Sequence, residues 1–455
     1  MKRYNLQVVL EAPLALKRDR QSDRSETVQS IPGTTLRGAL AALYLQQHGE
    51  ADPEFQRLFV QSGYCRFGPL DPARNIYPLS MTACKRRRND HPKVDQLANR
   101  IALHFTNGAI SQTVGKHLYE CPVEGCGSDL QKCVGFFEVL GNRMRDRSSH
   151  IHVAAHVGID RLTDTAADGV FYTLDAIAPL APPEEAPSDQ TQPGANQGAR
   201  RQSNGRLQSL SPTRLYGWLD ATDDAIQAVR QLLQRENNIL FLGHHRTRGY
   251  GRVRVVIDEK PEEEAAADEQ RWGQWSETII RFVNDAIASH DSEASACRLA
   301  PENDFIFALS LPTGAILVDR LLRYTPDLAD VISWLPPLPN IDCLFPVSER
   351  PVARIGQSGE VRCVLAITQQ QLVRGWNAAH GLPKQDEWMV ARGSVYVYWF
   401  RGSADDRAEL IHRLQQLRRA GVGLRRSEGY GQFVVNDPIH VQAMPGVQGE
   451  PKWQR

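Results

Sequence analysis

The stretch GHHRTRGYGRV at residues 243–253 recurs as GLRRSEGYGQF at residues 423–433, at a constant offset of 180 (423 − 243). Each copy follows a segment with the periodicity of an amphipathic helix and precedes a short strand-like segment. A glycine pattern that recurs with the same spacing, and with matching arginines and tyrosines, is far more specific than a single copy. It predicts two copies of one α+β domain.

Length and composition are those of a globular protein with more than one domain. The 455 residues are 41% hydrophobic and 23% charged, and this length exceeds what one hydrophobic core usually serves. No apolar run approaches the ~20 residues that span a bilayer, and the N-terminus is typical of a first β-strand and not of a signal peptide. We therefore expect a cytoplasmic protein without a membrane segment.

A change in composition near residue 259 divides the chain. We predict an N-terminal domain at 1–258 with a cysteine-rich insertion at about 60–140 and a disordered loop at 182–209, a connector helix at 259–300, a C-terminal domain at 301–440 and a tail at 441–455. Hydrophobic periodicity predicts the elements within these parts. The predicted strands are 4–11, 170–178, 214–220, 251–257, 303–310, 316–320, 360–367, 394–400 and 431–436, and the predicted helices are 34–47, 222–235, 268–290 and 403–419.

The glycine loops have the composition of an anion-binding turn. Their glycines permit a close backbone approach to a ligand, so that loop amides and Arg246 can hold a phosphate. Tyr250 and Tyr430 either stack a base or pack beneath the loop. The alternative interpretation is a tight turn that binds no ligand.

A second candidate for anion binding is the helix start in IPGTTLRGAL at 31–40. Thr34 is the expected N-cap, and the buried stripe is predicted to comprise Leu36, Leu40 and Leu43. Arg37 and Gly38 would lie in the first turn, where free amides and the helix dipole favour an anion. We expect a phosphate at this turn.

Five of the eight cysteines fall in the predicted insertion, and the spacing of some is that of a structural zinc site. The proposed ligands are Cys84, Cys121, Cys126 and Cys133, with His91 or Cys65 as substitutes for Cys133. The alternative is a set of reduced core thiols without a metal.

Four segments resemble the RAMP superfamily (repeat-associated mysterious proteins) of CRISPR effector complexes. They are IPGTTLRGAL, the loop that begins at Gly243, HVGIDRLTDTAADGVFYTLD at 156–175, and RGWNAAHGLPK at 374–384 followed by GSVYVYWF. The resemblance implies two ferredoxin-like, RRM-related domains, the first with a zinc-binding insertion. Two such domains in one chain look like the large double-RAMP subunit of type III-D systems.

The resemblance implies a non-catalytic role in an antiviral ribonucleoprotein complex. The chain would cap the 5′ repeat-derived end of the crRNA and contact RAMP backbone subunits and a large polymerase-like subunit. The clusters of basic residues, although the net charge is zero, favour RNA as the ligand. The residues expected to contact RNA are Arg37, Gly38, Lys85, Arg86, Arg87, Arg143, Arg145, His244, His245, Arg246, Arg248, Tyr250, Arg252, Arg425, Arg426 and Tyr430.

Two other functions stay open. Related proteins cut RNA, and here either the histidines His150, His152 and His156 or an acid upstream of the IPG turn would be needed. The acids available there are Asp23 and Glu26. The third function is a zinc-stabilised scaffold that contacts proteins and no RNA.

Overall fold

The computed structural model divides the chain into two compact units, which we describe separately. Unit 1 comprises Met1–Cys65, Pro69–Pro72 and Ser148–Pro261, and unit 2 comprises Arg66–Gly68, Ala73–Arg147 and Glu262–Arg455. Both units combine helices with antiparallel sheets, which confirms the α+β class. The described residues are 1–16, 27–61, 63–106, 118–140, 143–181, 210–262, 268–290, 298–319, 321–326, 328, 352–355, 358–377 and 380–444.

Some predictions lie outside the described residues. These are the disordered loop at 182–209, the acids Asp23 and Glu26, and most of the predicted tail. Within the described part of the chain, no helix is long and apolar enough to cross a membrane.

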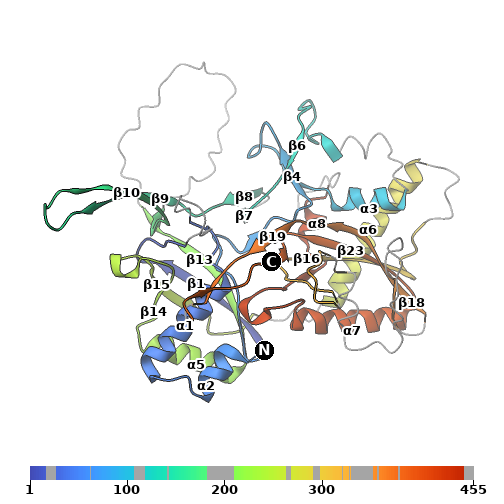
Figure 1. The fold of residues 1–455 in the computed structure, drawn as a ribbon. Coiled ribbons are helices and arrows are strands. Elements are labelled where there is room, and N and C mark those ends of the chain that lie inside the picture. The colour runs from blue at the N-terminus through green and yellow to red at the C-terminus, as the bar shows by residue number, and fades with distance from the viewer. Residues whose placement is uncertain are drawn as a thin grey trace. The chain divides into compact units, whose positions relative to one another are not determined.

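The main sheet of unit 1 has the strand order β14-β15-β1-β13-β2, in which β2 contributes only its first residue, Cys65, to this unit (Figure 1). Along β1, every second residue from Tyr4 to Leu10 is buried and the residues between are partly exposed. This alternation arises because helices α1 and α5 lie against one face of the sheet only. The bounds are β1 Lys2–Leu10, β2 Cys65–Phe67, β13 Arg214–Ala221, β14 Ile239–Phe241, β15 Arg252–Ile257, α1 Gly33–His48 and α5 Asp223–Gln234.

Helix α1 begins one residue before the predicted N-cap. Pro32 is extended, with φ −60° and ψ 145°, and the helix starts at Gly33 without a side-chain cap. The prediction that Thr34 is the N-cap is therefore wrong, because Pro32, whose ring holds its own φ at about −65°, occupies the N-cap position and the helix already includes Gly33. The buried stripe of Leu36, Leu40 and Leu43 is confirmed.

Unit 2 contains a sheet that is covered on both faces, with the order β17-β18-β23-β16-β24. All seven residues of β16 are buried. Phe305 and Phe307 pack with α7, and Ile306 and Ala308 pack with α3 and α6. The bounds are β16 Asp304–Ser310, β17 Val352–Ile355, β18 Gly359–Ile367, β23 Val395–Arg401, β24 Val434–Val435, α3 Leu97–Phe105, α6 Asp268–His290 and α7 Ala404–Ala420.

Much of the predicted insertion and the predicted connector helix pack in unit 2. Leu97 and Ile101 of α3 share one core with Ile279 and Val283 of α6. The prediction that the insertion belongs to the first domain, with α6 between the domains, is corrected by this packing. The physical reason is that periodicity in the sequence reveals the apolar face of a helix. It does not reveal which hydrophobic core buries that face.

Smaller elements complete the two units, and the predicted strand at 316–320 is not among them. The described residues of this stretch form only isolated bridges, Ile316 with Leu424 of the second glycine loop and Val318 with Tyr324, and pair with no neighbouring strand over several residues. The remaining bounds in unit 1 are α2 Pro53–Phe55, a π-helix Gln56–Val60, β9 Ile151–Ile159, β10 Ala166–Ile177, β11 Leu180–Ala181 and β12 Ser211–Pro212. In unit 2 they are β3 Asn75–Ile76, β4 Met81–Cys84, β5 Val94–Asp95, β6 Leu130–Lys132, β7 Phe136–Leu140, β8 Arg143–Arg147, β19 Gln370–Val373, β20 Trp376–Asn377, β21 Leu382–Pro383, β22 Glu387–Val390 and α8 Ile439–Gln442.

Candidate functional site

The two glycine loops have the same backbone conformation. His245 is left-handed with φ 58° and a 3-10 turn follows it, as Arg425 with φ 54° precedes the equivalent turn. The loop glycines also match: Gly243, Gly249 and Gly251 have φ of 75°, 85° and 84°, and Gly423, Gly429 and Gly431 have φ of 72°, 89° and 75°. The sequence repeat is therefore a structural repeat.

Each loop closes over the backbone that follows the first strand of its unit's main sheet. In unit 1, the N–H of His244 donates to the Ala15 carbonyl at 3.0 Å, and the N–H of Gly251 donates to the Pro13 carbonyl at 2.8 Å. The equivalent pairs in unit 2 are Leu424 to Ile316 at 2.9 Å and Gly431 to Gly314 at 2.8 Å. The shared geometry shows what the glycines do in both copies: they allow two stretches of backbone to touch.

The amides of the first loop are largely used within the protein. Besides the two bonds above, the N–H groups of Arg248, Gly249 and Tyr250 donate to carbonyls of His245 and Arg246. Because these five amides donate within the protein, fewer loop amides are open to a phosphate than we expected, and the side chains of the loop are the larger part of what it would meet.

The first loop carries exposed basic side chains. The side chains of His244, Arg246 and Arg248 are exposed, and the Arg248 guanidinium donates to the Tyr172 hydroxyl. The Tyr172 ring stacks on His156, with ring centroids 5.2 Å apart. Sequence reasoning missed Tyr172, because only the pairing of β9 with β10 brings it beside the loop.

Both loop tyrosines pack inside the protein. Tyr250 is 7% exposed and packs with Ala15 and Leu174, and its hydroxyl lies 3.3 Å from Nε2 of His156. Tyr430 is partly buried against Val373. The sequence left two roles open for these tyrosines, stacking on a base or packing beneath the loop. Both rings pack beneath their loops.

The strand after the first loop carries two arginines that share one acid. Arg252 and Arg254 form ion pairs with Glu11 at 2.8 and 2.7 Å. The hydrogen bond from Arg252 is the main cause that holds the pKa of Glu11 below its usual value. Sequence reasoning missed Glu11. This acid neutralises part of the positive charge of the arginines that we expected to contact RNA.

The second loop is neutralised more fully. The Arg425 guanidinium bonds Glu387 at 2.5 Å and also pairs with Glu428, and Lys384 lies 3.1 Å from the same Glu428. Of the two arginines predicted to contact RNA here, Arg426 is exposed and Arg425 is held by acids.

The helix start at 31–40 is used within the fold as well. Nε of Arg37 donates to the Phe59 carbonyl at 2.8 Å. This bond joins α1 to the end of the π-helix, so Arg37 supports local structure. At Gly38, an added Cβ would meet no atom within 4 Å, so the fold does not require glycine there for lack of space.

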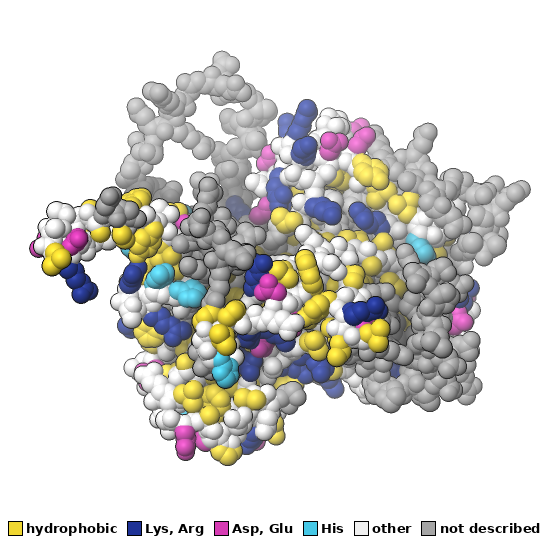
Figure 2. All heavy atoms as spheres, viewed as in Figure 1, with side chains coloured by type: hydrophobic (Ala, Val, Ile, Leu, Met, Phe, Trp, Pro, Cys, Tyr) yellow, Lys and Arg dark blue, Asp and Glu magenta, His cyan; other side chains and the backbone are white. Residues whose placement is uncertain are grey.

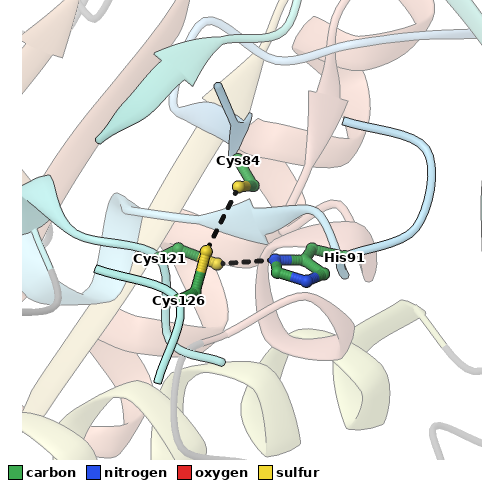
Figure 3. A group of neighbouring side chains, drawn as sticks. All are labelled: Cys84, His91, Cys121 and Cys126. Atoms are coloured by element: carbon green, nitrogen blue, oxygen red, sulfur yellow. Dashed lines mark hydrogen bonds between the residues drawn. The ribbon is translucent and has the colours of Figure 1, made fainter. Parts of the chain in front are cut away.

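Three cysteines and a histidine converge in unit 2 (Figure 3). The ligand atoms of Cys84, His91, Cys121 and Cys126 all lie within 4.8 Å of one another. Sγ of Cys84 lies 3.7 Å from Sγ of Cys126, and Nδ1 of His91 lies 3.2 Å from Sγ of Cys121. A tetrahedral zinc ion with Zn–S bonds of about 2.3 Å places its sulfur ligands about 3.8 Å apart. The donor set and its spacing fit such an ion.

Cys133 is not part of this cluster, so its predicted role as a ligand is wrong, and His91 takes the fourth position. The Cys133 amide donates to the Met81 carbonyl at 2.9 Å, and its side chain is buried with Tyr77 and Phe137. Cys65, the other proposed substitute, is also outside the cluster, and burial raises the pKa of its thiol to about 12.

The Cys84 thiol lies in an environment that favours the thiolate. Burial is the largest single influence and raises its pKa, but the hydrogen bonds from the N–H groups of Arg87 and Arg86, from Ser128 and from Cys126 together outweigh burial and lower the pKa to about 6. A thiolate is the form that binds metals, so this environment agrees with the metal site.

Basic side chains accompany the cluster. Lys85, Arg86, Arg87 and Arg143 are exposed and Arg145 is half-buried. Figure 2 shows lysine and arginine side chains gathered over the part of the molecule that Figure 1 labels β4 and β6. The sequence predicts that these residues contact RNA, and their exposure is compatible with that role.

A serine, a histidine and an aspartate form a hydrogen-bonded chain that sequence reasoning missed. Nε2 of His440 lies 2.7 Å from the Ser310 hydroxyl, and Nδ1 lies 2.7 Å from the Asp95 carboxylate. This connectivity is that of a hydrolase triad. However, Ser310 is 6% exposed and both partners are 0% exposed, so no substrate reaches the hydroxyl. We interpret the chain as a structural link.

Comparison with known proteins identifies the sequence family. A model of the RAMP superfamily matches residues 15–254, which are 240 (254 − 15 + 1) of the 455 residues. No curated protein matches the chain. Among solved structures, it is similar at 12% identity to a chain of the type III-B Cmr-beta complex bound to cognate target RNA, over 94% of this chain and 96% of that chain, with a TM-score of 0.38. It is also similar to oligomeric Cmr4 from Pyrococcus furiosus, at 12% identity over 58% of this chain and 100% of that chain, with a TM-score of 0.24.

Proposed function

Because this chain belongs to the RAMP superfamily, we propose that it binds the guide RNA of a type III CRISPR effector complex and catalyses no reaction. The observation that carries the proposal is the first glycine loop, where Arg246 and Arg248 are exposed and no acid occurs from Gly243 to Arg254. Exposed arginines bind RNA phosphates through bidentate hydrogen bonds.

The finer assignment is the large subunit of a type III-D complex, at the 5′ repeat-derived end of the crRNA, with other effector subunits as partners. It is supported by the presence of the loop in both units. The strand orders β15-β1-β13-β2 and β24-β16-β23-β18 also support ferredoxin-like domains, because a βαββαβ unit orders its strands in this way.

The double variant Arg246→Ala/Arg248→Ala is expected to weaken RNA binding and to lower its salt slope by about 1.4, at about 0.7 for each phosphate that is no longer neutralised. Fluorescence anisotropy with a labelled single-stranded oligouridylate, measured over a salt series, gives both quantities. Arg362→Ala, which removes an exposed arginine paired with Glu360, is the matched control and should change neither. Unchanged binding in the double variant would count against the proposal, and a wild type that binds no RNA would favour a protein scaffold.

We also propose that the cysteine–histidine cluster holds a structural zinc ion. Purified protein is expected to contain about one zinc per chain, and Cys126→Ala is expected to lose it because the tetrahedral set is broken. Cys133→Ala removes a buried thiol outside the cluster and should retain the metal. Metal analysis of the three proteins tests this, and equal zinc contents in the two variants would contradict the ligand set.

The absence of catalysis is part of the proposal, and His156 is the residue to test. It is partly exposed beside Tyr172 and Tyr250, near cations that bind phosphate. Repeat RNA incubated with the protein is expected to stay intact. RNA fragments with the wild type, and none with His156→Ala, would instead establish a ribonuclease.

A further inference from the structure

A turn of basic residues lies between two ligands of the cysteine–histidine cluster. Cys84 ends β4 and His91 follows after KRRRND at residues 85–90. The side chains of Lys85, Arg86 and Arg87 are exposed. Over the part of the chain that the structure describes, no carboxylate pairs with any of these three. The turn therefore presents three adjacent cations to solvent.

The other two cations of this region are used inside unit 2. Nε of Arg88 lies 2.9 Å from Asp146, and Nζ of Lys93 lies 2.6 Å from the same carboxylate. Lys93 is buried and also donates to the Tyr77 hydroxyl. These bonds anchor the base of the turn, so the structure separates the anchoring cations from those that face solvent.

The backbone of the turn is shaped by the cluster. The N–H of Arg87 donates to Sγ of Cys84 at 3.4 Å, and the N–H of His91 donates to the Arg87 carbonyl at 3.0 Å. Hydrogen bonds to sulfur are weak. A metal ion bound by both Cys84 and His91 would hold the two ends of the turn far more firmly than these bonds alone.

We propose that the metal and this turn form a single RNA-binding element, in which the metal holds the turn and Lys85, Arg86 and Arg87 bind phosphates of single-stranded RNA. The inference rests on the proposed function, since it takes RNA as the partner. RNA is favoured over a protein surface because all six residues of the turn are polar or charged. The core of a protein interface is instead depleted in charged residues and enriched in aromatic side chains, and arginine is the one cation that it favours. The turn contains no aromatic or aliphatic side chain that could form such a core.

The triple variant Lys85→Ala/Arg86→Ala/Arg87→Ala tests the element in the full-length protein. It leaves all four ligands in place, so it is expected to keep its zinc while its salt slope for the labelled oligouridylate falls by about 2, at about 0.7 for each phosphate. The charge-preserving variant Arg86→Lys/Arg87→Lys is expected to keep most of the slope. Removal of zinc by chelation should lower the slope of the wild type and should not lower that of the triple variant further.

The outcomes distinguish this inference from the proposed function. If the triple variant retains zinc and binds RNA with the slope of the wild type, while Arg246→Ala/Arg248→Ala still weakens binding, this inference fails and the proposed function stands. The same holds if chelation lowers the slopes of wild type and triple variant equally. A triple variant that binds RNA normally but loses another effector subunit in a pull-down would assign the turn to a protein partner instead.

Discussion

Gly251→Ala is expected to lower the free energy of unfolding of unit 1 by about 3–5 kcal/mol, because it combines two costs. The first is steric: a Cβ at this position would lie 2.0 Å from the carbonyl oxygen of Leu242. That carbonyl cannot easily move, since the Leu242 amide donates to the Gly251 carbonyl at 2.9 Å. The second is the left-handed backbone with φ 84°, which costs a residue with a Cβ about 1–2 kcal/mol.

Gly249→Ala is the matched control in the same loop. Gly249 has nearly the same φ of 85°, but a Cβ there meets no atom within 4 Å, so only the backbone cost of about 1–2 kcal/mol remains. Denaturant unfolding of the full-length protein, followed by hydrogen exchange of unit 1 peptides, measures both variants. Equal losses would show that the close approach to Leu242 is not what requires glycine.

His440→Ala is expected to destabilise unit 2 by about 3–5 kcal/mol, the usual cost of removing one partner from a buried ion pair. The ring is fully buried between the Ser310 hydroxyl and the Asp95 carboxylate, at 2.7 Å from each. Without the ring, the carboxylate of Asp95 keeps its bonds to Ser80 and the Leu97 amide but loses its only cation among the described residues.

Ser310→Ala is the control for this prediction, because it removes one hydrogen bond to the ring and leaves the ion pair intact. Its expected cost is about 1 kcal/mol. Chemical denaturation, with hydrogen exchange of unit 2 peptides as the readout, compares the two variants. A loss in Ser310→Ala as large as that in His440→Ala would show that the pair with Asp95 does not dominate.

The pair also gives unit 2 a pH dependence with a defined sign. Burial lowers the pKa of His440, but the charge of Asp95 and the hydrogen bond to it outweigh burial and raise that pKa above its ordinary value. The resulting stabilisation is complete below the unfolded pKa of about 6.5 and is lost as pH rises through the raised pKa of the folded state. His440→Ala should lack this loss, and a parallel pH profile in wild type and variant would contradict the assignment.

The glycine loops were predictable because their demands are local. A positive φ and the absence of a Cβ must be satisfied by the residue itself, so both appear in the sequence as glycine, and Gly251 and Gly431 mark the same turn. The charge of the loops was not predictable in the same way. The acids that neutralise the cations come from distant segments, as Glu11 and Glu387 show.

The metal ligands illustrate the same division. The knuckle that holds Cys121 and Cys126 is a short-range pattern, and three of the four proposed ligands are members of the cluster. The fourth proposed ligand, Cys133, is outside the cluster because of tertiary packing. It follows β6, which pairs with β4, and its side chain is buried in a hydrophobic core. His91 lies in the cluster because the turn after β4 brings the chain back toward Cys84.

By itself, the sequence determined that the chain is α+β, that one loop occurs twice, and that cysteines and basic residues share a segment. These follow from backbone conformation and from the periodicity of apolar residues, which act over a few residues. Only the tertiary structure decided which core buries α3 and α6, which arginines are neutralised, and that the tyrosines lie beneath their loops. Those outcomes depend on contacts between segments far apart in the chain, and such contacts cannot be inferred from the conformational preferences of neighbouring residues.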